Sequence, residues 1–73
     1  MITIEQIRAR IAEAIKYSGM SQTELAKKLG IKQPTVGQYL SGRALPALDT
    51  LANLCKILDI DANYILCQDI NDK

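Results

Sequence analysis

Three of the four glycines divide the first two thirds of the chain into segments of similar length, and this spacing limits the helices that can form. Gly19, Gly30 and Gly42 follow one another at intervals of 11 and 12 residues. Glycine readily takes the left-handed backbone conformation that ends helices. Between the glycines, apolar residues recur at helical spacing. The pattern therefore predicts short helices joined by tight corners, and it carries no clear signal for a strand.

The core of these helices has to be aliphatic, because three tyrosines are the only aromatic residues among 73. Hydrophobic residues make up 48% of the sequence. A chain of this size buries only about 60% of its unfolded surface, so its core must be compact and well filled. We expect one all-α domain over residues 1–67. The polar tail, residues 68–73, is expected to fray or to begin a linker.

Helix start signals predict five helices. Thr3 with Gln6 and Ser21 with Glu24 each fit a capping box, in which the two residues satisfy each other's free backbone N–H groups. Asp61 can cap a short last helix. The expected helices run from about Thr3 to Gly19, Ser21 to Gly30, Gln33 to Leu40, Ala47 to Leu58, and from Asp61 onward.

Apolar stripes predict which face of each helix turns inward. In the fourth expected helix the stripe is Leu48, Leu51, Ala52, Cys55 and Leu58. In the other helices the inward residues are Ile4, Ile7, Ile11, Ala14 and Ile15, then Leu25, Ala26 and Leu29, then Val36 and Leu40, and last Tyr64 as a core anchor with Ile65 and Leu66.

Several classes of function are disfavoured by what the sequence lacks. The chain has no histidine, and Cys55 and Cys67 lie far apart. Two buried or half-buried thiols are therefore expected, without a zinc site or a disulfide. We see no phosphate-binding glycine loop and no paired carboxylates, so we expect no enzyme activity and no cofactor. Neither a bilayer-spanning run nor a secretory signal is present, which predicts a cytoplasmic protein.

The charge is distributed unevenly along the chain although the net charge is only +1. Residues 1–43 hold seven Lys and Arg against three Glu, a net charge of +4. Residues 44–73 hold two Lys against five Asp, a net charge of −3. The N-terminal half could face a polyanion while the other half faces away from it.

The segment from Ser21 to Arg43 has the features of two helices joined by a tight corner. Ala26 is small where the helices must cross closely, and Gly30 accepts a positive φ in the corner. Ile31 and Val36 are placed to hold the two helices at one angle from beneath. Such a helix-turn-helix presents the first turn of its second helix to solvent, and a helix of this width fits the major groove of DNA.

These residues resemble the phage repressor and Cro-type (XRE-type) helix-turn-helix family. The resemblance rests on the spacing of Gln22, Ala26, Gly30, Ile31 and Val36, followed by Ser-Gly-Arg. It extends over nearly the whole chain through Gly-Met-Ser, Leu-Pro and Asp-Ile-Asp-x-x-Tyr. It implies a compact five-helix, lambda-repressor-like domain. It also implies a sequence-specific DNA-binding transcriptional regulator, expected to be a repressor of bacterial or phage origin that binds a palindromic operator as a homodimer.

The resemblance also implies roles for individual residues. Gln33, Pro34, Thr35 and Gln38 match base-reading positions, and a Gln amide suits the N7 and N6 atoms of adenine. Thr35 could instead offer its hydroxyl to a phosphate. The phosphate contacts are expected from Gln22, Lys32, Arg43 and, besides a packing role, Tyr39. The candidate dimer surface is Ile60, Ile65, Leu66 and Ile70.

The sequence departs from the family pattern at three places. Pro34 can make only apolar contact with a base. Gly37 lies inside the third helix, where it either lets the backbone approach DNA or is tolerated at a cost of about 1 kcal/mol. Ile15 and Leu40 occupy positions where many members carry an ion pair, and we expect the two to touch. Two further interpretations of the chain stay open. It could be the DNA-binding domain of a larger phage-type repressor, or a protein-interaction module that keeps the fold without binding DNA.

Overall fold

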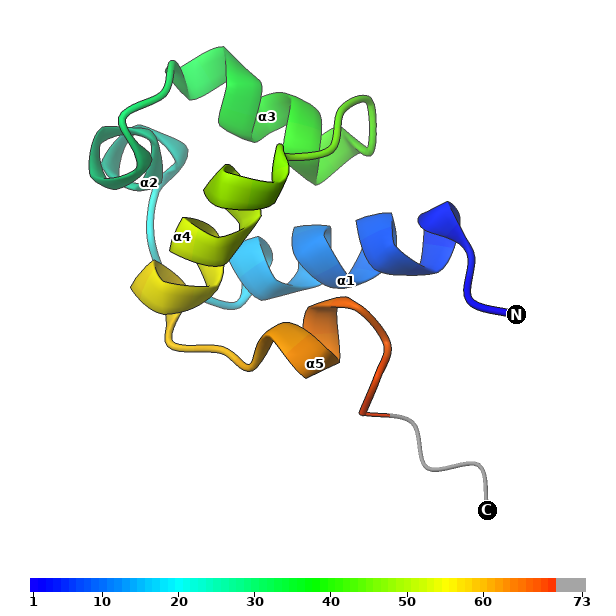
Figure 1. Ribbon diagram of the computed structural model, residues 1–73. Coiled ribbons are helices and arrows are strands. Elements are labelled where there is room, and N and C mark those ends of the chain that lie inside the picture. Colours follow the sequence, from blue (N-terminus) through cyan, green and yellow to red (C-terminus); the bar gives the residue numbers. More distant parts are fainter. Residues whose placement is uncertain (70–73) are drawn as a thin grey trace.

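The computed structural model describes residues 1–69, which form five α-helices and no strand (Figure 1). The helices are α1 (Ile4–Lys16), α2 (Gln22–Leu29), α3 (Gln33–Ser41), α4 (Leu48–Leu58) and α5 (Ala62–Ile65). The predicted all-α, five-helix architecture is confirmed. Within the described residues no helix is both long enough and apolar enough to cross a membrane.

Local side-chain caps set where the helices begin. Thr3 and Gln6 form the complete capping box, because the Thr3 hydroxyl accepts from the Gln6 N–H at 3.2 Å and the Thr3 N–H donates to Gln6 Oε1 at 2.8 Å. Ser21 accepts from the Glu24 N–H at 3.0 Å. No bond returns from the Glu24 side chain among the described residues, so the second predicted box is only half formed.

Four of the five helices end in the same hydrogen-bond pattern around one left-handed residue. After α2, for example, the Gly30 N–H donates to the Lys27 carbonyl and the Ile31 N–H to the Ala26 carbonyl, which is the Schellman arrangement. The left-handed residues are Gly30, Gly42, Asp59 and Cys67. The sequence predicted the two glycines but not Asp59 or Cys67.

The end of α1 differs from the prediction. The helix stops at Lys16 with Tyr17 as its cap, at φ −89°. Gly19 is left-handed, at φ 81°, but it lies two residues beyond that cap. Gly19 therefore turns the chain toward α2 and does not itself end α1.

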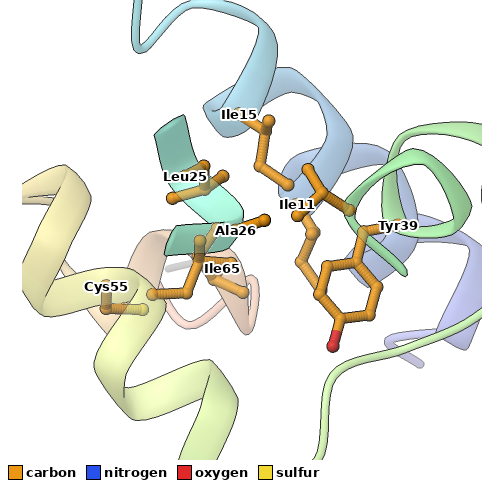
Figure 2. Packing of buried hydrophobic residues seen from close by; sticks show 9 residues of the cluster. Ile11, Ile15, Leu25, Ala26, Tyr39, Cys55 and Ile65 are labelled. Carbon is orange, nitrogen blue, oxygen red and sulfur yellow. The ribbon is translucent and has the colours of Figure 1, made fainter. Parts of the chain in front are cut away.

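The core is mainly aliphatic, as predicted, although it also contains the Tyr39 ring, and it is assembled from all five helices (Figure 2). In Figure 1, α1 runs through the middle of the molecule with α3 on one side and α5 on the other, and it contacts both. The two cysteines are buried free thiols, as expected. The buried residues are Ile11, Ile15, Leu25, Ala26, Val36, Tyr39, Leu54, Cys55, Ile65 and Cys67.

The inward face of α4 was predicted correctly for Leu51, Cys55 and Leu58 but wrongly for Leu48 and Ala52. Leu48 is 85% exposed and Ala52 is also exposed, whereas Leu54 is fully buried. Leucines lie around most of this helix, so periodicity alone allowed two stripes. Packing against α2 selects the stripe formed by Leu51, Leu54, Cys55 and Leu58.

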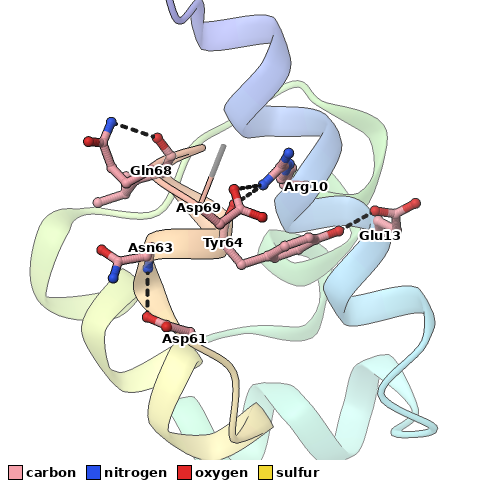
Figure 3. Close-up of polar contacts among 8 residues, drawn as sticks. Arg10, Glu13, Asp61, Asn63, Tyr64, Gln68 and Asp69 are labelled. Atoms are coloured by element: carbon pink, nitrogen blue, oxygen red, sulfur yellow. Dashed lines mark hydrogen bonds and ion pairs between the residues drawn. The ribbon is translucent and has the colours of Figure 1, made fainter. Parts of the chain in front are cut away.

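Tyr64 joins α5 to α1 through polar contacts at the rim of the core (Figure 3). Its hydroxyl donates to the Glu13 carboxylate, and the Arg10 guanidinium lies 4.5 Å from its ring centroid. Arg10 also donates to the Tyr64 carbonyl at 2.7 Å and pairs with Asp69. Tyr64 is half-buried and packs against the core cluster, in agreement with the predicted anchor, and its polar contacts form in addition a polar tie between α5 and α1.

Candidate nucleic-acid interface

The corner between α2 and α3 has the predicted geometry. Gly30 is left-handed at φ 72°, and only Ile31 and Lys32 separate it from α3. Ala26, at 3% exposure, and Val36, at 0%, are buried where the two helices meet, and Ile31 packs against the same core. Since these residues are held by the core, the angle between α2 and α3 is held with them.

The outer face of α3 presents uncharged side chains, most of them polar. Gln33, Pro34 and Gln38 are exposed, and Thr35 is half-buried. Pro34 occupies the second position of the helix, where its missing N–H has no intrahelical use. The four predicted base-reading residues thus all lie at least partly at the surface, three of them in the first turn of the helix.

The amide groups of Gln33 and Gln22 are bonded to each other across the corner. Gln33 Nε2 donates to Gln22 Oε1 at 2.7 Å, between residues 11 positions apart in sequence. This bond uses one of the two amide hydrogens of Gln33 and leaves its carbonyl oxygen and second hydrogen available. It also leaves the Gln22 NH₂ group available as a donor. The structure therefore brings together a predicted base-reading residue and a predicted phosphate-binding residue.

Gly37 lies beside this amide pair. A Cβ built on Gly37 would lie 3.4 Å from Gln22 Oε1, and it has no other heavy atom within 4 Å apart from the helix's own backbone and chain neighbours. This distance is ordinary van der Waals contact, so an alanine would fit and the Gln22 side chain does not require glycine here. The two explanations predicted from the sequence, a close approach to DNA or a tolerated glycine, both stay predictions.

The two cations among the predicted phosphate-binding residues are exposed, one at each end of α3. Lys32 precedes the helix and makes no side-chain cap, and Arg43 follows Gly42. The described residues form a single ion pair, between Arg10 and Asp69. Lys32 and Arg43 are therefore not neutralised by a carboxylate within that part of the chain.

Tyr39 is a core residue. It is 5% exposed, and its ring lies among the aliphatic side chains of Figure 2. Burial, with a smaller contribution from the negative charge of Asp49, raises the pKa of its phenol. The packing role predicted for Tyr39 is confirmed. Its role at a phosphate stays a prediction and involves the hydroxyl alone.

The predicted dimer surface needs correction. Ile65 is fully buried inside the protein, so it is not part of any docking surface. Ile60 is half-buried and packs against the core, while Leu66 is 37% exposed. Ile70 lies outside the described residues. Leu48, which the sequence placed in the core, is instead the most exposed leucine.

The predicted contact between Ile15 and Leu40 is consistent with the packing. Ile15 belongs to the core cluster, and the half-buried Leu40 packs against that cluster.

Among the described residues there is no group of three or more His, Cys, Asp or Glu side chains that could hold a metal ion.

Comparison with known proteins gives several matches. A family model described as helix-turn-helix matches residues 11–65. The chain is 36% identical over 58 residues to the uncharacterized HTH-type transcriptional regulator YqaE of Bacillus subtilis, which covers 80% of this chain and 50% of YqaE. It is 29% identical over 70 residues to the ImmF control region 10 kDa protein of Bacillus phage phi105, with 96% of this chain and 78% of that protein covered.

A solved structure shares the fold. The solution structure of the SOS-response transcriptional repressor LexA from Eubacterium rectale matches with a TM-score of 0.79 and covers 96% of this chain and 76% of that one. The sequences are 20% identical, so the likeness concerns the fold alone. The chain spans about half the length of YqaE and a smaller part, 30%, of several regulators of conjugative elements.

Proposed function

The chain belongs to the helix-turn-helix family of DNA-binding transcriptional regulators, and on that premise we propose that α3 reads a specific sequence in the major groove. The observation that carries the proposal is the bond between Gln33 and Gln22. It holds an amide at the exposed start of α3 in one orientation, which lowers the entropy lost when that amide meets a base.

Gln33 is suited to adenine in this arrangement. Its carbonyl oxygen accepts from the adenine N6 group, and its remaining amide hydrogen donates to N7, while the other hydrogen stays bonded to Gln22. Gln38 supplies a second base contact, and Pro34 and Thr35 offer apolar contact to thymine methyl groups. Each good bidentate pair contributes about 1–3 kcal/mol to discrimination between bases.

Contacts to the DNA backbone orient the domain. The free NH₂ group of Gln22 donates to a phosphate near the start of α2, where the backbone N–H groups of the helix also favour an anion. Lys32 and Arg43 bind phosphates at either end of α3, and Tyr39 contributes at most a hydroxyl. These contacts supply affinity with little sequence information.

We propose further that the protein acts as a dimeric repressor on a palindromic operator in a bacterial cytoplasm. One domain covers a modest DNA surface, and a two-fold dimer doubles the sequence read. Exposed Leu66 and half-buried Ile60 are the parts of the predicted dimer surface that stay available. A bound dimer represses by occupying promoter DNA, which requires no additional contact with the transcription machinery. Residues 1–67 form the DNA-binding domain in this proposal, and 68–73 a tail or linker.

Selection of bound duplexes from a random DNA pool tests the proposal. We expect a palindromic motif whose half-sites contain adenine under Gln33. Gln33→Ala should relax the preference at that base, whereas Arg43→Ala should weaken binding to all sequences alike. Gln68→Ala, which removes an exposed amide that lies outside the helix-turn-helix, is the matched control. No enriched motif, or an affinity that does not change with salt concentration, would contradict the proposal.

A further inference from the structure

Two arginines on α1 face different neighbours. Successive residues of a helix are about 100° apart, so Arg8 and Arg10 point to nearly opposite sides of α1. Arg10 faces α5, where Tyr64 and Asp69 satisfy it. Arg8 faces the end of α3, because its Cδ lies 4.0 Å from the position that a Cβ on Gly42 would occupy.

Arg8 is held by packing and not by a polar partner. The residue is half-buried, and its Nε is buried without a hydrogen-bond partner. Within the described residues the single ion pair is that of Arg10, so no carboxylate there neutralises Arg8. Its terminal Nη groups donate no hydrogen bond to residues 1–69 either. An arginine fixed by its stem, with its charge uncompensated, is pre-organised to bind an external anion.

The position of Arg8 complements that of Gln22. Gln22 is bonded to Gln33 at the start of α3, whereas Arg8 lies against Gly42 at the end of α3, next to exposed Arg43. The nine residues of α3 span about 14 Å, which is comparable to the width of the major groove, about 12 Å. If α3 lies across the groove, phosphates on its two sides therefore fall near the two ends of the helix.

We propose that Arg8 is a further phosphate-binding residue that, together with Arg43, anchors the end of α3 to the DNA backbone. The inference rests on the proposed function. Phosphate oxygens accept from the terminal Nη groups of Arg8, and the fork geometry allows two parallel bonds. Because the stem of Arg8 is already packed against the end of α3, less side-chain entropy is lost on binding than for an arginine with a free side chain. With Gln22 at the other end, this anchor fixes the tilt of α3 in the groove.

The test is the salt dependence of binding to a random-sequence DNA duplex. Arg8→Met removes the charge and keeps an apolar stem, and Arg8→Gln is a second neutral variant in case methionine disturbs the packing. Each lost phosphate contact lowers the slope of log K against log salt by about 0.9, which corresponds to about eightfold weaker binding at about 0.1 M salt. Arg8→Lys should keep the slope. Circular dichroism and thermal melting establish that each variant is folded.

Arg10→Met is the matched control, because it removes the same charge from the same helix on the opposite face. It should lower the melting temperature and leave the slope unchanged. An unchanged slope in the folded neutral Arg8 variants, or an equal drop in Arg10→Met, would overturn the inference while leaving the proposed function intact. If the wild-type protein itself shows no salt-dependent binding, both fail together.

Discussion

The two halves of the molecule end their helices with the same backbone pattern but with different residues. In the helix-turn-helix half, α2 and α3 end at Gly30 and Gly42. In the C-terminal half, the left-handed residues after α4 and α5 are Asp59 and Cys67. A residue with a Cβ pays about 1–2 kcal/mol for this conformation, and glycine does not. The glycine itself therefore favours the backbone conformation of the corner between α2 and α3. The corners after α4 and α5 depend on packing elsewhere to offset the backbone strain at Asp59 and Cys67.

The packing of the C-terminal half is tested most strongly at α4. Leu54→Ala should lower the free energy of unfolding by about 3 kcal/mol, because Leu54 is fully buried and its removal leaves a cavity. Leu48→Ala, on the same helix but 85% exposed, should change it by less than about 0.5 kcal/mol. Urea denaturation of both variants measures the difference. Equal losses would mean that α4 is rotated from the position described.

The local encoding of the helix-turn-helix corner is tested at Gly30. No atom beyond its chain neighbours lies within 4 Å of an added Cβ, so Gly30→Ala meets no steric clash. It should still destabilise the protein by about 1–2 kcal/mol, because φ is 72°. Thermal or urea unfolding gives this value, and a neutral result would remove the contrast between the two halves.

Replacing the left-handed aspartate should act in the opposite direction. Asp59→Gly should stabilise the protein by about 0.5–1 kcal/mol, since relief of backbone strain exceeds the added entropy of the unfolded chain. Asp59→Asn keeps the Cβ and removes the charge at the end of α4, so it separates strain from the interaction with the helix dipole. If Asp59→Asn raised the stability as much as Asp59→Gly, the whole gain would be due to removal of the charge.

A smaller stabilisation is expected at Gly37, inside α3. Gly37→Ala improves helix propensity, and its Cβ would be in ordinary contact with Gln22 Oε1 at 3.4 Å. We expect a gain of about 0.5 kcal/mol with an unchanged sequence preference. Unfolding and the selected DNA motif should be measured on the same variant. A gain in stability with a relaxed motif would mean that the amide pair of Gln22 and Gln33 has been displaced.

The hydrogen bond between Tyr64 and Glu13 predicts a small loss of folding stability at high pH. The hydrogen bond to Glu13, and then burial, raise the pKa of Tyr64 above its ordinary value of 10.0. The folded state therefore holds this proton more tightly than the unfolded state. The contribution of the protonated Tyr64 hydroxyl to stability is present below pH 10 and is lost as the pH rises through the folded-state pKa. In Tyr64→Phe, stability should fall less steeply above pH 10, and identical pH profiles would exclude this linkage.

Much of the fold followed from local sequence signals. The Thr3 capping box, the Ser21 and Asp61 caps and the left-handed glycines act within a few residues, so they could be read directly. The surface position of Gln33, Gln38 and Arg43 followed from the same periodicity. The predicted roles of these residues at DNA bases and phosphates are a separate matter, which the proposed binding experiments address.

The sequence by itself determined the number of helices, their approximate ends and the corner at Gly30, because capping and backbone strain are local. Only the tertiary structure decided that Leu54 and not Leu48 is buried, and that Asp59 and Cys67 take the left-handed conformation. It also decided that Gln22 meets Gln33 and that Arg8 and Arg10 acquire different surroundings. These outcomes depend on which helix faces are brought together, and a leucine-rich helix or an exposed amide is compatible with more than one such arrangement until its neighbours are in place.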